Sequence, residues 1–243
     1  MNEEIGAHSL LQVPILGEVH SDTVFTTWIV MALVLIFLAW VGSSYRSPRV
    51  GRTQTVLEGV VNYVADTVHG ALGPSGEPFI PFFLGVFIFI FALNQFGAFP
   101  LKVFGLPVGG SPTADINTTL ALSLMVWLTI QVTGFRRKGI GYLGHLTKPF
   151  VAVTPLNILD ELLRPITLAA RLFFNIFIGE LLPIVVASII IAKVSIGAFN
   201  LSLAAAVVPF FVQFFNLIVG TIQAFVFTLL GIVYMSLNLS DEH

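Results

Sequence analysis

The stretch VFTTWIVMALVLIFLAWVGS, Val24 to Ser43, holds no charged residue in twenty positions. About 20 apolar residues are needed for an α-helix to cross the hydrocarbon core of a bilayer. Inside lipid, every backbone polar group must be hydrogen-bonded within the protein, which a helix does on its own. This stretch therefore predicts a membrane-spanning helix, and with it a fold that is built for lipid rather than for water.

The composition of the whole chain supports the same fold class. The 243 residues are 56% hydrophobic and 10% charged, with a mean hydropathy of +0.94. A soluble domain usually carries about 25% charged residues, so a soluble all-α domain is excluded. The net charge of −2 gives no sign of a nucleic-acid partner, and the absence of cysteine excludes disulfides and cysteine-ligated metals. No cofactor is expected.

Apolar segments recur along the chain and predict an all-α integral membrane protein with about five membrane helices. The expected spans cover residues 24–44, 79–101, 115–135, 156–194 and 199–237. Residues 1–22 are polar and acidic and lack the basic region of a signal peptide. We therefore expect them to form an extracytoplasmic segment ahead of a single membrane domain, residues 23–243.

Residues 53–72 predict a helix of a different kind. Apolar side chains recur on one helical face there, whereas the opposite face carries polar and charged groups such as Glu58 and Asp66. This pattern is typical of an amphipathic helix that lies at the membrane interface. Its acidic polar face favours packing on protein over packing on anionic lipid.

The last two spans are too long to stand upright in a bilayer. A helix of about 38 residues measures roughly 57 Å, against a hydrocarbon core of about 30 Å. We expect a hairpin of two long, steeply tilted helices, with Pro183 and Pro209 as candidate kink points. No internal repeat relates the two halves of the chain, which disfavours a secondary transporter.

Basic residues indicate the orientation of the chain. With five spans, one side collects Arg46, Arg49, Arg52, Arg136, Arg137, Lys138 and Lys148. Cytoplasmic loops carry an excess of Lys and Arg, so we expect the N-terminus outside and the C-terminus in the cytoplasm.

Arg171 opens the stretch RLFFNIFIGE within one of the long spans. An arginine at the centre of a membrane helix costs about 2.5 to 3.5 kcal/mol on insertion scales, faces a protein interior or an aqueous cavity, and marks an ion or substrate path. The alternative is a structural ion pair with Glu180. Nine residues on a regular helix place those two side chains on opposite faces, whereas Asn175 shares the face of Arg171.

Two further polar features accompany this arginine. Glu180 is interpreted either as a proton-binding carboxyl in an aqueous entry path or as a hydrogen-bonded core carboxyl. Gln213, Asn216 and Gln223 fall within about 60° of one another on the final span. This polar stripe predicts interhelical hydrogen bonds. For Gln223 the alternative is a contact with Arg171 across the antiparallel hairpin.

Four stretches, in order, resemble subunit a of the rotary F-type ATP synthases: ALNQFGAFP, PTADINTTLAL, RLFFNIFIGELL and GTIQAFVFTLLGIVYMS. The resemblance covers about residue 24 to the end. It implies a non-catalytic stator subunit, whose two aqueous half-channels carry protons to and from the carboxyls of a rotating c-subunit ring. The implied partners are that ring, b-type peripheral stalk subunits, the rest of the synthase and membrane lipid.

The resemblance also implies roles for individual residues. Arg171 matches the family's essential arginine, Gln223 the glutamine beside it, and Asn175 and Glu180 polar residues of the half-channel walls. Asn216 stands where some relatives have histidine, and Phe174 where glycine is frequent. Gln213, Asp115 and Asn117 are further candidates for channel lining, although helix capping is favoured for Asp115.

Two other functions stay open at this point. One is a stand-alone ion or anion transporter that uses the buried arginine, and the other is a membrane assembly or scaffold protein. The choice between proton and sodium is set on another chain, by the surroundings of the ring carboxyl. The expected location is a bacterial inner membrane, with the thylakoid membrane as the alternative.

Overall fold

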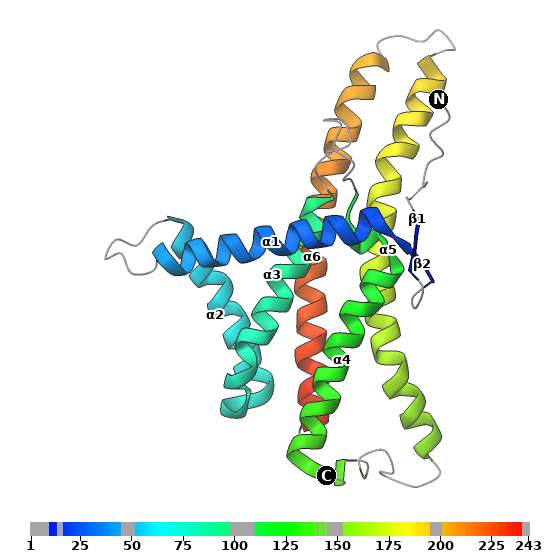
Figure 1. The fold of residues 1–243 in the computed structure, drawn as a ribbon. Helices are drawn as coiled ribbons and strands as arrows, with labels where there is room; N and C mark the ends of the chain where they lie inside the picture. Colours follow the sequence, from blue (N-terminus) through cyan, green and yellow to red (C-terminus); the bar gives the residue numbers. More distant parts are fainter. Residues whose placement is uncertain are drawn as a thin grey trace.

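The computed structural model describes residues 10–13, 17–44, 52–97, 110–139, 141–142, 144, 153–194 and 201–239. Two short strands come first and six helices follow, with two 3₁₀ turns among them (Figure 1). In chain order they are β1 (Leu10–Val13), β2 (Gly17–His20), α1 (Ser21–Ser44), α2 (Arg52–Leu72), η1 (Gly73–Phe79), α3 (Ile80–Phe96), η3 (Pro112–Ala114), α4 (Ile116–Lys138), α5 (Thr154–Val194) and α6 (Leu201–Leu239).

The predicted all-α membrane fold is confirmed. Within the described residues, five helical segments are long and apolar enough to cross a membrane. The strands β1 and β2 are an addition that the sequence did not predict, and they pair antiparallel with Leu10 opposite His20. Strands of four residues carry too little periodicity to be recognised from sequence alone.

A sharp turn separates α2 from α3. Gly73 follows α2 directly with a φ of +62°, a conformation that favours glycine, and η1 then leads into the next helix. Pro81 stands in the first turn of α3, where its missing N–H costs nothing. The expected span 79–101 thus corresponds to a helix that ends at Phe96, and residues 98–101 lie outside the described part of the chain.

The two longest helices form the expected antiparallel hairpin. α5 has 41 residues and α6 has 39, and they lie side by side along their length (Figure 1). α5 remains helical through both Pro165 and Pro183, and α6 through Pro209. Figure 1 shows α5 changing direction along its length rather than breaking.

α1 runs across the bundle instead of along it. It packs on α3 and η3, and in Figure 1 it lies crosswise to the α5–α6 hairpin. Helices that cross in this way cannot all stand along one membrane normal. If α1 spans the bilayer, the hairpin must therefore tilt strongly, as its length requires.

The core lies where α2, α3, α4, α5 and α6 meet. Its fully buried side chains include Val68, Phe83, Val126, Leu172 and Phe227, one from each of these helices. α2 packs on protein through Val64 and Val68, and the Tyr63 ring lies 4.8 Å from that of Phe225.

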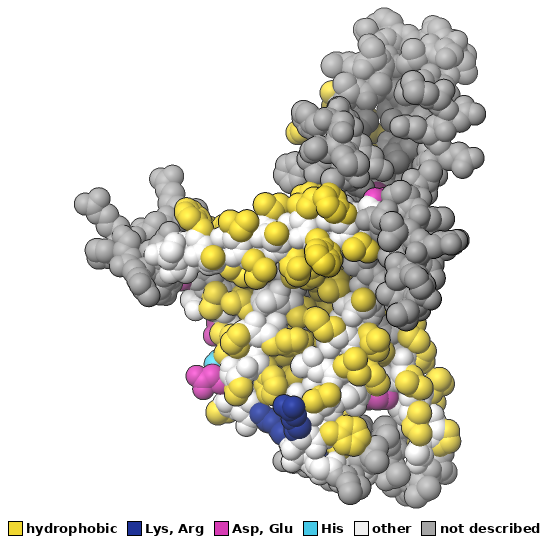
Figure 2. All heavy atoms as spheres, viewed as in Figure 1, with side chains coloured by type: hydrophobic (Ala, Val, Ile, Leu, Met, Phe, Trp, Pro, Cys, Tyr) yellow, Lys and Arg dark blue, Asp and Glu magenta, His cyan; other side chains and the backbone are white. Residues whose placement is uncertain are grey.

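By contrast, α1 is covered with outward apolar side chains (Figure 2). Trp28 is 67% exposed and Ile36 is 66% exposed. In water such a surface would be a liability, whereas lipid accepts it.

Candidate functional site

A small polar cavity lies between α3, η3, α5 and α6. Its volume is about 20 Å³, and a cavity of roughly 10 to 15 Å³ already holds one water molecule. Its lining consists of Ile176, Val219 and eight polar or glycine residues: Asn94, Gly97, Ser111, Asn175, Gly179, Glu180, Gln213 and Asn216. Four of the residues that the sequence singled out, at positions 175, 180, 213 and 216, therefore meet at one water-sized space.

Glu180 is anchored by backbone rather than by a cation on its own helix. The Ser111 N–H donates to the Glu180 carboxylate. Gly110 comes directly before, with a φ of +92°, and a Cβ added to it would lie 3.5 Å from Glu180 Oε2. The chain entering α4 thus passes close against the carboxylate because a glycine stands there.

A chain of hydrogen bonds continues from Ser111 into α3 and α6. Ser111 Oγ donates to the Leu93 carbonyl at 2.9 Å and lies 2.5 Å from Thr113 Oγ1. Thr113 donates to Asn94 Oδ1 at 2.7 Å, and Asn94 Nδ2 donates to the Gly220 carbonyl at 2.9 Å. These residues were missed as site residues. The signal was present, because Asn94 and Gln95 are adjacent amides in a strongly apolar helix.

Two side-chain contacts join α5 to α6 beside the cavity. Asn216 Nδ2 donates to the Gly179 carbonyl. A Cβ added to Gly179 would lie 3.0 Å from Asn216 Oδ1, so the glycine permits this approach. One helical turn earlier on α5, Asn175 Nδ2 donates to Gln223 Oε1 at 2.6 Å.

Gln223 therefore pairs with Asn175 and not with Arg171. Its side chain is buried, and its Nε2 finds no partner among the described residues. A buried amide N–H without a partner costs free energy unless a group outside the chain accepts from it.

Arg171 lies outside the cavity, on the exposed surface of α5. Within the described part of the chain its side chain makes no ion pair and no hydrogen bond, so the structural pair with Glu180 is not formed. The described part of this chain therefore leaves the Arg171 side chain uncovered. Phe174 and Ile178, three and seven residues further along α5, are exposed apolar side chains on the same side of the helix, at 55% and 56%.

Asp115 and Asn117 have a local structural role at the start of α4. The Asn117 N–H donates to Asp115 Oδ1 at 2.8 Å, which is an N-cap contact. The Asn117 side chain is exposed, and neither residue lines the cavity. Among the described residues no cluster of His, Cys, Asp or Glu is arranged to hold a metal ion.

Fold and site together define a multi-pass membrane protein. Its longest helical hairpin lines a polar cavity on one side and carries an exposed arginine on its outer surface. The family model described as ATP synthase A chain matches residues 24–236, and the chain belongs to that family. It is thus a membrane subunit of the Fo sector of an ATP synthase, in the proton-channel role and without catalysing the chemistry of ATP itself.

Proposed function

We propose that this chain is the stator that passes protons to and from the carboxyls of a c-subunit ring through two half-channels. The observation that carries the proposal is the position of Arg171, exposed and without a partner in the described chain, amid an apolar face of α5 and α6. A charge at that depth needs a protein or aqueous partner. A carboxyl on a neighbouring subunit meets that need.

The chemistry follows from a fixed positive charge. Arg171 beside a ring carboxyl favours its ionised form, and so its proton loss on the exit side. The same charge repels protons that would pass directly between the two half-channels. Arginine suits the task because it stays charged when desolvated, which lysine does not reliably do. Each proton crossing about 100 mV contributes about 2.3 kcal/mol.

The cavity supplies one half-channel. Glu180 and Gln213 line it, with Asn175 and Asn216 on the α5–α6 seam. Asn175 also binds Gln223, so the seam connects the cavity wall to the helix face that carries Arg171. We propose Glu180 as the proton-binding group of this path and the three amides as groups that hold water beside it. For Asp115 and Asn117, which were candidates for the channel mouth, we propose the helix-capping role instead.

Of the two departures from the family pattern, Asn216 lies on this seam and Phe174 lies on the exposed face of α5. Phe174 is 55% exposed on the same face as Arg171, and its ring packs edge-on against Phe173 at 5.2 Å. The bulky Phe174 side chain therefore stands where the proposed c-subunit ring would approach. Asn216 cannot titrate, so the proton-binding role near it rests on Glu180 and water.

The remaining partners and the setting are proposed with the same subunit role. We propose b-type peripheral stalk subunits and the rest of the synthase as partners, and α2 as a helix at the membrane interface. The N-terminal segment lies outside and the C-terminus in the cytoplasm of a bacterial inner membrane, or in the equivalent thylakoid arrangement. A stand-alone anion transporter is disfavoured because Arg171 does not reach the cavity.

Cross-linking tests the ring interface. The chain has no cysteine, so one introduced thiol is unique in this subunit. Ile178→Cys, labelled with a photoactivatable benzophenone maleimide in the assembled complex, should form an adduct with the c subunit on illumination. Trp28→Cys on α1, where the native side chain is also exposed, is the control and should not form this adduct. Adducts at both positions, or at neither, would contradict the proposed ring interface.

A further inference from the structure

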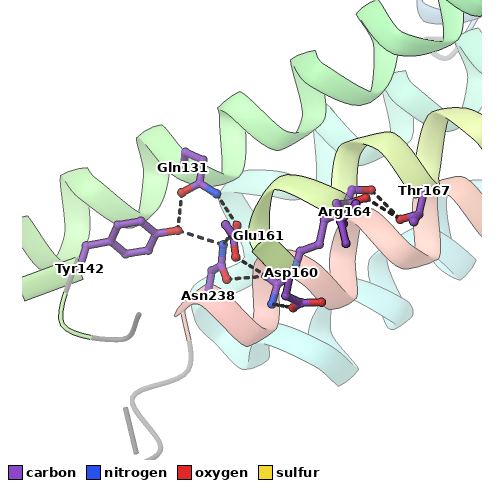
Figure 3. Close-up of polar contacts among 8 residues, drawn as sticks. Gln131, Tyr142, Asp160, Glu161, Arg164, Thr167 and Asn238 are labelled. Atoms are coloured by element: carbon purple, nitrogen blue, oxygen red, sulfur yellow. Dashed lines mark hydrogen bonds and ion pairs between the residues drawn. The ribbon is translucent and has the colours of Figure 1, made fainter. Parts of the chain in front are cut away.

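A second polar cluster, remote from the cavity, closes the open end of the α5–α6 hairpin (Figure 3). We call it the clamp cluster, and its members are Gln131, Tyr142, Glu161, Arg164 and Asn238. They come from α4, the turn after α4, α5 and α6. Neither the sequence motifs nor the proposed proton path uses any of them.

Hydrogen bonds close this cluster into a ring. Tyr142 OH donates to Gln131 Oε1 at 2.6 Å, and Gln131 Nε2 donates to Glu161 Oε1. Asn238 Nδ2 donates to Tyr142 OH at 3.0 Å and to Glu161 Oε1 at 3.3 Å. Each member therefore both positions its neighbours and is positioned by them.

Arg164 connects the hydrogen-bonded clamp cluster to α5, its own helix, and to α6. Its Nη1 lies 2.9 Å from Glu161 Oε2 and donates to Asn238 Oδ1 at 2.9 Å. Its Nη2 lies 3.3 Å from Asp160 Oδ2, and its guanidinium stacks 5.4 Å from the centre of the Tyr234 ring. The positive charge is thus compensated within the chain, unlike that of Arg171.

Tyr142 is seated by a glycine. A Cβ added to Gly134 would lie 2.3 Å from Tyr142 Cε2, so the ring rests directly on the backbone of α4. Tyr142 is 2% exposed, and its burial raises the pKa of the phenol to about 12. The hydroxyl keeps its proton and stays fixed as a donor to Gln131.

We propose that the clamp cluster holds α4, α5 and α6 in register. Arg171 then keeps its position along the membrane normal and its orientation while the c-subunit ring rotates past it. Arg164 and Arg171 are seven residues apart, about two turns or roughly 10 Å along one helix face. Anchoring the first therefore fixes the second. This inference rests on the proposed stator function, because a stator bears the force that turns the ring.

Two variants loosen the clamp without touching the proton path. Gly134→Ala drives the Tyr142 ring from its seat, and Tyr142→Phe removes only the hydroxyl. Tyr63→Phe is the matched control, since that hydroxyl makes no hydrogen bond within the described residues and its ring lies on α2. All are measured in the whole synthase in membrane vesicles at equal subunit abundance. The readouts are ATP hydrolysis, ATP-driven proton pumping and hydrogen exchange of residues 231–239.

We expect Gly134→Ala and Tyr142→Phe to raise exchange in residues 231–239 by roughly tenfold. Hydrolysis should continue while fewer protons are pumped per ATP, because a loosened stator slips. The control should match the wild type. Unchanged coupling despite faster exchange would make the cluster merely structural and overturn the proposal. Loss of both hydrolysis and pumping with unchanged exchange would make it a conduit and overturn it equally.

Two further comparisons make the result decisive. If Gly134→Ala does not assemble, Tyr142→Phe alone decides, since it removes one atom and keeps the ring. Arg171→Ala is measured in the same series. If that variant pumps like the wild type, the stator function itself fails. A clamp variant that leaves coupling intact while Arg171→Ala abolishes pumping overturns only the clamp.

Discussion

Asn175 and Gln223 join the two long helices, with Asn175 Nδ2 donating to Gln223 Oε1 at 2.6 Å. Asn175 shares its helix face with Arg171 and also lines the polar cavity. The pair is therefore the point at which the cavity, the hairpin seam and the outward arginine face come together. The Nε2 of Gln223 is buried at this point and has no hydrogen-bond partner in the described chain.

Removing Asn175 should leave the buried Gln223 amide unpaired. We expect Asn175→Ala to destabilise the subunit by about 1 to 3 kcal/mol, the cost of an unsatisfied buried polar group. Asn175→Ala combined with Gln223→Leu should cost less than the two single changes together, because no orphaned amide then remains. Thermal unfolding in detergent measures both. Additive effects would contradict a direct bond, and Asn117→Ala, an exposed amide, is the control.

A side chain at Gly179 should shift Asn216 on the neighbouring helix. A methyl group there would lie 3.0 Å from Asn216 Oδ1, so Gly179→Ala should displace Asn216 and reduce proton pumping. Gly85→Ala is the control, since no atom lies within 4 Å of its added Cβ. Pumping at the wild-type rate in Gly179→Ala would show that Asn216 has no part in the path.

Glu180 should contribute to proton pumping through the proton that it binds and not through the shape of its side chain. Glu180→Gln keeps an oxygen that accepts from the Ser111 N–H, so assembly should persist. Pumping should fall on the order of a hundredfold, which is typical of losing a proton-transferring group. Glu77→Gln, an exposed carboxylate on η1, should pump normally. Equal pumping in the two variants would assign Glu180 to the structural core.

Asp115 should act as a cap rather than as a channel group. Asp115→Asn keeps a side-chain acceptor for the Asn117 N–H and should retain both stability and pumping. Asp115→Ala should lose about 1 kcal/mol of stability, the usual cost of an N-cap. A strong loss of pumping in Asp115→Asn, measured in vesicles, would instead place this carboxyl in the channel mouth.

The Tyr142 phenol should lose its proton only at unusually high pH. Burial raises its pKa to about 12, the negative charge of Glu161 adds to the rise, and Arg164 opposes it. Because the folded-state pKa is above the unfolded value of 10.0, this stabilisation is complete below pH 10 and is lost as the pH rises through about 12. Alkaline absorbance titration of wild type minus Tyr142→Phe should show one tyrosinate step near pH 12. A tyrosinate step near pH 10 in place of the step near pH 12 would contradict the burial.

The membrane fold was readable from sequence because lipid imposes length and composition on every span. The lengths of α5 and α6 predicted the hairpin, and the polar stripe on α6 predicted its seam. The outward direction of Arg171 was not predictable, because periodicity places a residue on a helix face without saying whether another subunit covers that face. The clamp cluster was missed for a different reason. Glu161 lies 30 residues from Gln131 and 77 from Asn238, and only tertiary packing brings them together.

The central claim is that Arg171 couples proton flow to the rest of the synthase. ATP-driven proton pumping in membrane vesicles, wild type against Arg171→Ala at equal subunit abundance, tests it most directly. The account predicts that pumping is lost while the complex remains assembled, since the fixed positive charge that governs the ring carboxyl is gone. Pumping at the wild-type rate in Arg171→Ala would contradict the account.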